Sequence, residues 1–406
     1  MHYSQRGRNR AAALPGFNRG RAHSGHHSND SSTADSSTVK ELKEPVFPRQ
    51  SEREDLALPH EDSLLGAIAN EQTHDVVVVG ASAGGVEALM TFVAGLPANL
   101  EAAVFVVLHI PANIPSSLHR ILGHAGPLPA KLAEDNELIV CGNIYVAPPD
   151  SHLLLTATSM RITHGPHENW QRPAIDPLFR TAAIAFGPRV VGIVLSGALD
   201  DGTAGLIAIK RLGGIALVQD PDTAVFPSMP LSACSYASVD YSLPVPALAA
   251  KVVELSGVTV PHQERKSRVP RDMDLEARLA GLDPTAVENN THVGTISELT
   301  CPQCRGPLWE IHDGRLLRFR CRVGHAFTAE ALMEGQSQTV ERNLWIALNS
   351  LEESTQLYSR LALSAYAHDD KRAREFDEKV ERFNERMRVI REMMIPVSDQ
   401  KPPDGK

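Results

Sequence analysis

One serine of this 406-residue chain lies in a context typical of a hydrolase nucleophile. Ser82 belongs to the stretch Gly80-Ala-Ser-Ala-Gly-Gly85 and follows the four valines Val76 to Val79. Four β-branched apolar residues predict a buried strand, and the glycines allow a tight turn into a helix. A serine at such a turn, beside the N–H groups of a helix N-terminus, offers a nucleophile and an oxyanion site. A phosphate cradle and a plain turn stay open, whereas the glycine spacing disfavours a dinucleotide-binding turn, which needs Gly-x-Gly-x-x-Gly.

Two further strand ends carry groups that complete a nucleophilic triad. A serine nucleophile needs a base within hydrogen-bond reach and a third group that orients the base. His109 directly follows one buried apolar run, and Asp200 and Asp201 follow another that ends at Leu195. Because functional groups gather at the carboxyl ends of parallel strands, we expect these side chains near Ser82. Position alone does not choose between the two aspartates, since Asp is also a preferred helix N-cap, and a structural histidine is the alternative for His109.

The elements that must position these residues lie between residues 75 and 256, where short apolar runs alternate with helical stretches. This alternation predicts an α/β catalytic domain: a doubly wound, mostly parallel sheet with helices on both faces. The segment 152–163 alternates like an antiparallel ribbon, which predicts a small mixed edge of the sheet. The expected strands are 75–79, 103–108, 143–147, 190–195 and 215–218, and the expected helices are 85–95, 115–123, 176–186, 202–212, 229–236 and 245–255.

The flanking segments differ in composition from this core. Residues 1–74 and 397–406 are polar and lack apolar periodicity, which predicts disordered tails. Residues 257–297 are rich in charges, Pro and Gly, and we expect a linker with at most one short helix. Apolar residues recur at helical spacing through 329–396 with a break at His368, which predicts a helical hairpin or a coiled coil.

Three of the five cysteines crowd into residues 298–328. A C-x2-C pair followed by a C-x3-H pair predicts a structural zinc site in a zinc-ribbon-like module, with a hairpin between the two pairs. The expected ligands are Cys301, Cys304, Cys321 and His325. His312 competes for the fourth position but lies near the hairpin tip. Reactive or unligated thiols are the alternative.

Composition excludes several classes of function. The net charge of −9 gives no general signal for nucleic acid or for an anionic membrane surface. No apolar run approaches the roughly 18 residues of a membrane span, and no secretory signal precedes the first strand. We therefore expect a cytoplasmic protein with no nucleic-acid partner and no membrane insertion.

Six ordered motifs resemble the catalytic domain of bacterial chemotaxis protein-glutamate methylesterases, the CheB type. The motifs are Gly80-Ala-Ser-Ala-Gly-Gly85, Leu108-His-Ile-Pro111, Ile144-Tyr-Val-Ala-Pro-Pro149, Arg172-Pro-Ala-Ile-Asp-Pro-Leu-Phe179, Leu195-Ser-Gly-Ala-Leu-Asp-Asp-Gly202 and Ala224-Val-Phe-Pro-Ser-Met-Pro230. The resemblance implies hydrolysis of γ-glutamyl methyl esters on receptor helices, release of methanol and, in many members, glutamine deamidation. It implies Ser82 as nucleophile, His109 as base and then acid, and Asp201 as the orienting carboxylate, with no cofactor for catalysis.

The chain departs from the family pattern near the expected oxyanion site. It has Gly197-Ala-Leu199 where the family commonly has Gly-Met-Gly, and Ala83 where many members carry a hydroxyl. These departures motivate an alternative, a catalytically weak signalling or binding module that keeps the esterase fold and docks through its zinc ribbon.

The resemblance also bears on partners and regulation. It implies a methylated chemoreceptor or similar sensory protein as substrate, and a methyltransferase or another sensory-pathway protein as a candidate partner of the C-terminal region. The zinc module resembles an extension of relatives without a receiver domain, and residues 1–74 are not expected to form such a domain. We expect this module to dock, either to a partner or over the esterase domain. Its arginines predict either a contact with an acidic surface or, equally, a solvated basic face; they are Arg315, Arg318, Arg320 and Arg322.

Overall fold

The computed structural model describes residues 73–260, 269–289 and 294–394, all within one compact unit. The predicted disorder of the two tails lies, apart from residues 73 and 74, outside the described residues.

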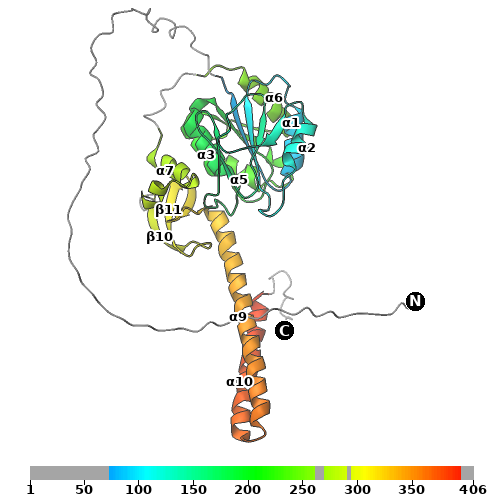
Figure 1. Cartoon of the computed structure of the whole chain (residues 1–406), viewed down its shortest axis with the longest axis vertical. Helices are drawn as coiled ribbons and strands as arrows, with labels where there is room; N and C mark the ends of the chain where they lie inside the picture. The colour runs from blue at the N-terminus through cyan, green and yellow to red at the C-terminus, as the bar shows by residue number, and fades with distance from the viewer. Residues whose placement is uncertain (1–72, 261–268, 290–293, 395–406) are drawn as a thin grey trace, which may run out of the picture. The chain divides into compact units, whose positions relative to one another are not determined.

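A central seven-stranded sheet organises the esterase domain (Figure 1). Its strand order is β3-β4-β2-β1-β7-β8-β9, and every neighbouring pair is parallel. Most of its strands are apolar runs buried on both faces, as the runs of valine predict. The strands are β1 (Val76–Ala81), β2 (Ala103–Leu108), β3 (Ala130–Leu132), β4 (Ile144–Val146), β7 (Val190–Val194), β8 (Ile215–Gln219) and β9 (Tyr241–Leu243).

Helices cover both faces of this sheet, which confirms the predicted fold class. One core cluster packs α1 (Gly85–Ala94), α2 (Leu118–Ala125) and α6 (Val245–Ser256) against one face. The other packs α3 (Ile175–Phe186), α4 (Thr203–Arg211) and α5 (Ser228–Tyr236) against the opposite face. Since β1 lies at the centre, the turn that follows it opens at the middle of the sheet edge.

Two details of the predicted sheet are wrong. The segment 152–163 does form an antiparallel pair, β5 (His152–Leu155) and β6 (Met160–Thr163), but this pair is a separate two-stranded sheet and not a mixed edge. The strands β3 and β9 were not expected. Each has only three residues and lacks a buried apolar run, so periodicity gives no signal for them.

The segment predicted as a linker contains two helices, α7 (Arg271–Ala280) and α8 (Pro284–Asn289). Helix α7 buries Met273, Glu276 and Leu279. The apolar pattern that would predict this buried face is weak, because the helix carries many charges and one of its buried residues is itself a carboxylate.

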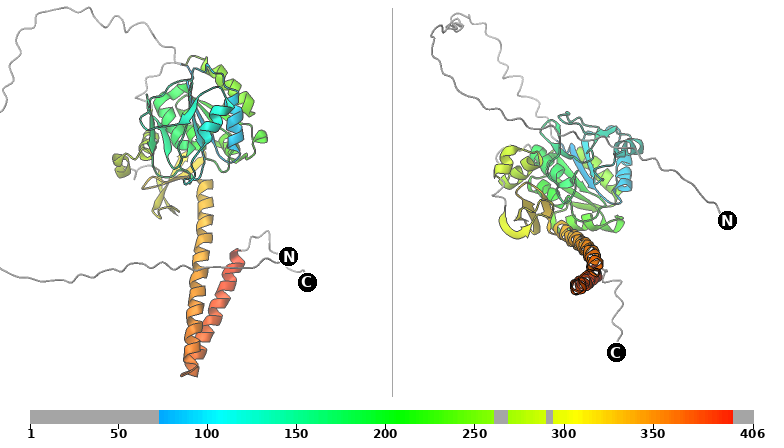
Figure 2. Two further views of the ribbon diagram at one scale, coloured as in Figure 1. Left: turned by 45° about the vertical axis from the view of Figure 1, so that its right-hand side comes forward. Right: turned by 60° about the horizontal axis from the view of Figure 1, so that its bottom comes forward.

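The C-terminal region begins with a four-stranded antiparallel sheet and ends in a helical hairpin. We call the sheet the ribbon; its strands are β10 (Thr295–Thr300), β11 (Pro307–Asp313), β12 (Leu316–Cys321) and β13 (Ala326–Thr328). Helices α9 (Ala329–Ala365) and α10 (Asp370–Met394) lie side by side (Figure 2), with the Tyr358 ring 5.6 Å from that of Phe383. Among the described residues, no helix is long and apolar enough to span a membrane.

Candidate active site

The structure brings Ser82, His109 and Asp201 together at the carboxyl ends of β1, β2 and β7. The Ser82 hydroxyl lies 3.1 Å from Nδ1 of His109. Nε2 of the same ring lies 2.8 Å from Oδ2 of Asp201. The three side chains therefore form one continuous hydrogen-bonded chain, with the imidazole in the middle.

The register of the central strands explains how residues far apart in sequence meet here. Ala81 pairs with Leu108 in the parallel ladder of β1 and β2, so Ser82 and His109 are the next residue on each strand. The His109 N–H donates to the Ala81 carbonyl at 3.1 Å, which extends the ladder by one step. The two side chains leave the sheet at the same level.

Asp201 is buried, and several donors hold its carboxylate. Oδ2 accepts from the Ile175 N–H at 2.7 Å, and Oδ1 accepts from the Asn169 side-chain amide at 3.1 Å and the Gly202 N–H at 3.0 Å. Burial opposes ionisation, but the hydrogen bonds from His109 and from these donors outweigh it, so the pKa of Asp201 is lowered. An ionised carboxylate only accepts, so Nε2 of His109 carries the proton and Nδ1 is free to accept from Ser82.

Asp200, the alternative left open by the sequence, hydrogen-bonds to a residue of the ribbon. Its Oδ1 accepts from the Thr328 hydroxyl at 2.7 Å. Burial, together with the charges of Glu330 and Asp201, raises the pKa of Asp200 to about 7. Of the two aspartates, Asp201 is the one that contacts His109.

The turn at Gly197 borders the nucleophile. A Cβ on Gly197 would collide with Sδ of Met229 and lie 2.9 Å from Cβ of Ser82, so only glycine fits this approach. Two residues later, Leu199 has φ 60°, a left-handed conformation that strains any residue with a Cβ. The chain thus keeps a glycine-like backbone at Leu199, where the family commonly has glycine.

Two polar residues of the site were not singled out from the sequence. Asn169 lies at hydrogen-bond distance from both Asp201 and Asp176. Asp176 accepts from the Gly202 and Gly205 N–H groups, and burial plus the charge of Asp201 raises its pKa well above its usual range. Asp176 falls within the motif Arg172-Pro-Ala-Ile-Asp-Pro-Leu-Phe179, and an acidic residue between apolar ones in this motif was the signal that the sequence offered.

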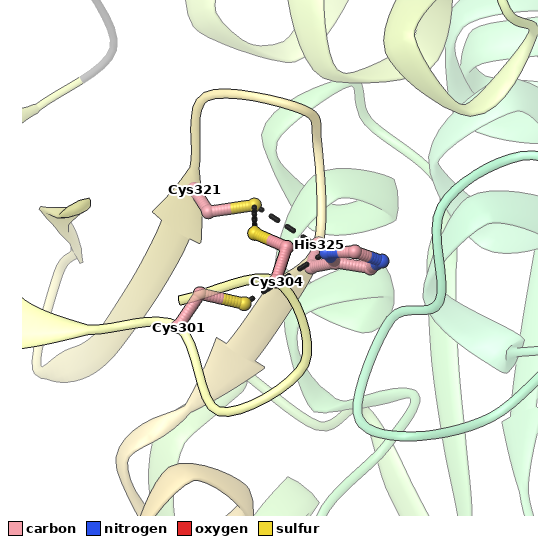
Figure 3. A group of neighbouring side chains, drawn as sticks. All are labelled: Cys301, Cys304, Cys321 and His325. Carbon is pink, nitrogen blue, oxygen red and sulfur yellow. Dashed lines mark hydrogen bonds between the residues drawn. The ribbon is translucent and has the colours of Figure 1, made fainter. Parts of the chain in front are cut away.

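The four predicted metal ligands form a second cluster (Figure 3). Their ligand atoms all lie within 4.8 Å of one another, from Sγ of Cys301, Cys304 and Cys321 to Nδ1 of His325. Nδ1 of His325 lies 3.5 Å from Sγ of Cys321 and 3.8 Å from Sγ of Cys301, and the sulfur atoms of Cys304 and Cys321 are 3.6 Å apart. A tetrahedral zinc with about 2.3 Å bonds to sulfur places its ligands roughly 3.8 Å apart, so the donor set fits zinc. His312 is not part of this cluster and bonds to Glu310 instead.

Comparison with known proteins identifies the esterase domain. Residues 77–252 match the family described as CheB methylesterase. A relative from Leptospira interrogans is 39% identical over 183 residues, which are 45% of this chain and 95% of the relative. The chain belongs to the CheB methylesterase family. The relative carries the name "Putative protein-glutamate methylesterase/protein-glutamine glutaminase".

Other CheB relatives are longer than the shared region. A protein-glutamate methylesterase/protein-glutamine glutaminase of Anaeromyxobacter dehalogenans is 36% identical over 49% of this chain and 55% of its own length. One from Burkholderia thailandensis is 35% identical over 55% of this chain and 62% of its own. The crystal structure of the Thermotoga maritima CheB methylesterase catalytic domain shares 34% identity, with a TM-score of 0.44, over 45% of this chain and 98% of that one. Family membership confirms the resemblance drawn from the six motifs and the predicted class of enzyme, a carboxyl-ester hydrolase.

Proposed function

We propose that this chain is a protein-glutamate methylesterase that hydrolyses γ-glutamyl methyl esters on chemoreceptor-like proteins and releases methanol. The observation that carries the proposal is the hydrogen-bonded chain from Ser82 through His109 to Asp201 at the centre of the sheet edge. This is the arrangement of nucleophile, base and orienting carboxylate that acyl transfer requires.

The geometry assigns each group a step. As the Ser82 hydroxyl oxygen attacks the ester carbonyl carbon, Nδ1 of His109 takes the hydroxyl proton. The tetrahedral intermediate then expels the methoxy group, which receives that proton and leaves as methanol. Water then attacks the acyl carbon and gives a proton to Nδ1 of His109; the second intermediate expels the Ser82 oxygen, which takes this proton back, and the glutamate side chain is released as a carboxylic acid. Asp201 stays ionised and stabilises the imidazolium that forms at each stage.

The negative charge on the tetrahedral intermediate needs donors near Ser82. We assign one to the backbone N–H of Ala198, because the Gly197 turn lies against the nucleophile. A backbone donor does not depend on the side chain, so alanine at this position can serve where the family has methionine.

Glutamine deamidation fits the same machinery. The leaving group is then ammonia in place of methanol, and the acyl-enzyme and its hydrolysis are unchanged. The relatives' names include protein-glutamine glutaminase, which supports this second activity.

One observation favours the alternative of a catalytically weak binding module. Leu199 adopts φ 60° beside the proposed oxyanion donor, so this loop holds a leucine in a left-handed conformation at a position where the family commonly has glycine. The intact contacts among Ser82, His109 and Asp201 favour the enzyme.

We further propose a structural zinc held by Cys301, Cys304, Cys321 and His325, which would stabilise the ribbon and take no part in catalysis. We also propose action in the cytoplasm on a methylated sensory protein, with the C-terminal region open to a methyltransferase or another pathway partner. The proposed organisation is an esterase domain at 75–256, a connecting segment at 257–297, the zinc ribbon at 298–328 and a helical hairpin at 329–396.

The test is methanol release from methylated chemoreceptor fragments by the full chain and by Ser82→Ala. The wild-type protein should release methanol, and Ser82→Ala should lose at least about 10⁴-fold in rate because the nucleophile is gone. If the wild-type protein releases no methanol at concentrations where a CheB relative is active, the enzyme hypothesis fails and the binding module is the better hypothesis. Thr91→Ala, on an exposed turn of α1, is a matched control that should keep full activity.

A further inference from the structure

Asn169 connects the orienting carboxylate to the ribbon. Its side-chain amide nitrogen donates to Oδ1 of Asp201 and to Oδ2 of Asp176, each at 3.1 Å. Its side-chain oxygen accepts from the backbone N–H of Thr328 at 3.0 Å. Because an N–H group only donates, the contact with Thr328 fixes which end of the amide is oxygen and turns the nitrogen toward the two carboxylates.

The backbone around Asn169 is also held by the C-terminal region. The Asn169 N–H donates to the Ala326 carbonyl at 2.9 Å, and the indole N–H of Trp170 donates to the Ala331 carbonyl at 2.8 Å. The Trp170 ring also packs on Phe327, with ring centroids 5.2 Å apart. The segment that carries Asn169 is therefore clamped by β13 and the first turn of α9.

The conformation of this segment needs such support. Asn169 has φ 49° and Trp170 has φ 67°, two consecutive residues in the left-handed region. For residues other than glycine this conformation is costly, and it persists only where surrounding contacts determine it. Here those contacts come from residues more than 150 positions later in the chain.

Buried ion pairs also join the esterase domain to α7 and the ribbon, and we call this contact the junction. Glu168, next to Asn169, accepts from Arg180 of α3 at 2.6 Å and from Arg320 of β12 at 3.1 Å. Glu276 of α7 lies 3.1 Å from Arg318 of β12 and 3.1 Å from Arg180. Burial opposes ionisation of Glu168, and the neighbouring arginines outweigh it and lower its pKa. The two arginines of β12 predicted to meet an acidic surface thus meet carboxylates of this same chain.

We propose that Asn169 is a positioning residue for Asp201, and that the ribbon holds Asn169 in place through the Thr328 N–H, so that the ribbon completes the active site. The inference rests on the proposed function, because it concerns how the triad carboxylate is held. The ribbon lies outside the residues that match the family, so this support belongs to this chain's own C-terminal region.

The proposal predicts which contacts control reactivity. Without the Asn169 amide, Oδ1 of Asp201 loses one donor and the carboxylate can rotate away from the geometry that orients His109. Displacing a reacting group from its aligned position costs on the order of 10-fold to 100-fold in rate. Binding of a small reagent at Ser82 should be unaffected, because Asn169 lies behind Asp201 and not in contact with the serine.

The experiment measures how fast Ser82 reacts with a fluorophosphonate probe in the full chain. The serine oxygen forms a bond to phosphorus, fluoride leaves, and the hydroxyl proton passes to His109 and then to solvent. Asn169→Ala should lower the maximal rate of labelling, kinact, by about 10-fold or more. The half-saturating concentration KI should stay within twofold, and every molecule should still be labelled at completion.

A matched pair at Thr328 isolates the contribution of the ribbon. Thr328 has φ −71°, which proline adopts without strain, so Thr328→Pro removes the N–H and the hydroxyl while Thr328→Ala removes only the hydroxyl. The proline variant should show a kinact about 10-fold below that of the alanine variant. Arg315→Ala removes a hydrogen bond from the turn between β11 and β12 to the Ser235 carbonyl, which does not hold the Asn169 segment, and it should keep the wild-type kinact.

The outcomes separate the inference from the proposed function. Wild-type labelling that Ser82→Ala abolishes, with an unchanged kinact in Asn169→Ala, would overturn the positioning role alone. Equal kinact for the two Thr328 variants would remove the role of the ribbon, and this pair decides the question if Asn169→Ala does not fold. If the wild-type chain is not labelled at Ser82, the proposed function fails and the inference falls with it.

Discussion

Replacing Asp200 with asparagine should stabilise the protein at alkaline pH and not at acidic pH. Asp200 is 1% exposed, and its carboxyl accepts a hydrogen bond from Thr328 that an asparagine oxygen can also accept. Burial raises its pKa from the usual 3.8 to about 7. Asparagine has nearly the same shape and does not ionise, so it removes the cost of burying a charge.

The raised pKa fixes the sign and the pH window. A carboxyl whose pKa is higher in the folded state stabilises the protein below its unfolded pKa, and this stabilisation is lost as the pH rises through the folded pKa. A rise from 3.8 to about 7 corresponds to about 4 kcal/mol in all, of which about 2.5 kcal/mol falls between pH 5 and pH 8. The free energy of unfolding of Asp200→Asn, relative to wild type, should therefore rise by about 2.5 kcal/mol over that interval.

Urea unfolding of both proteins at pH 5, 6, 7 and 8 measures this difference. Asp222→Asn is the matched control, because it makes the same chemical change at an exposed position. A difference between Asp200→Asn and wild type that stays constant from pH 5 to pH 8 would refute the reasoning, since it would mean that the folded protein does not resist ionisation of Asp200.

Three further outcomes test the site and the ribbon. Asp201→Asn should lower kcat about 10⁴-fold, because the neutral amide favours the wrong tautomer of His109; retention of a tenth of the activity would contradict the role of Asp201. Leu199→Gly should raise the free energy of unfolding by about 1 kcal/mol, since relief of the φ 60° strain exceeds the entropy lost by glycine. A loss of stability in urea unfolding would show that side-chain packing dominates there. Cys301→Ser should abolish zinc in elemental analysis and lower the melting temperature, because metal and fold are coupled in such modules; an unchanged melting temperature would count against a structural metal.

The sheet and its edge could be predicted because local patterns determine them. The four valines of β1 and the apolar run of β2 indicate strands buried on both faces, and parallel pairing then places Ser82 and His109 at one edge. The cysteine spacing likewise indicates a ligand set without any knowledge of the fold. Each of these signals lies in one or two short stretches of the sequence.

The choice between Asp200 and Asp201, and the role of Asn169, could not be predicted from local pattern. Both aspartates follow the same strand, and only the path of the loop after Leu195 turns one of them toward His109. The role of Asn169 depends on its hydrogen bond with Thr328, which is 159 positions away and belongs to the ribbon. Helix α7 was not predicted for a related reason: its buried Glu276 is neutralised by arginines of a distant strand, so the sequence shows no apolar residue at that position.

The distribution of charge across the junction has a consequence for how the two sides can part. On the esterase side, Glu168 and Arg180 form a pair of opposite charge, and beyond residue 260 the carboxylates Glu276 and Asp313 match the guanidinium groups of Arg318 and Arg320. Arg211 of α4 adds a further positive charge on the esterase side and lies 3.2 Å from Asp272 and 3.5 Å from Asp313, so the two sides carry charges of opposite sign. Separation would break the buried pairs Arg180–Glu276 and Arg320–Glu168 and leave charges without their partners, which is costly for buried groups. The support that the C-terminal region gives to Asn169, and through it to the triad carboxylate, thus depends on charges that are paired only while the two sides stay together.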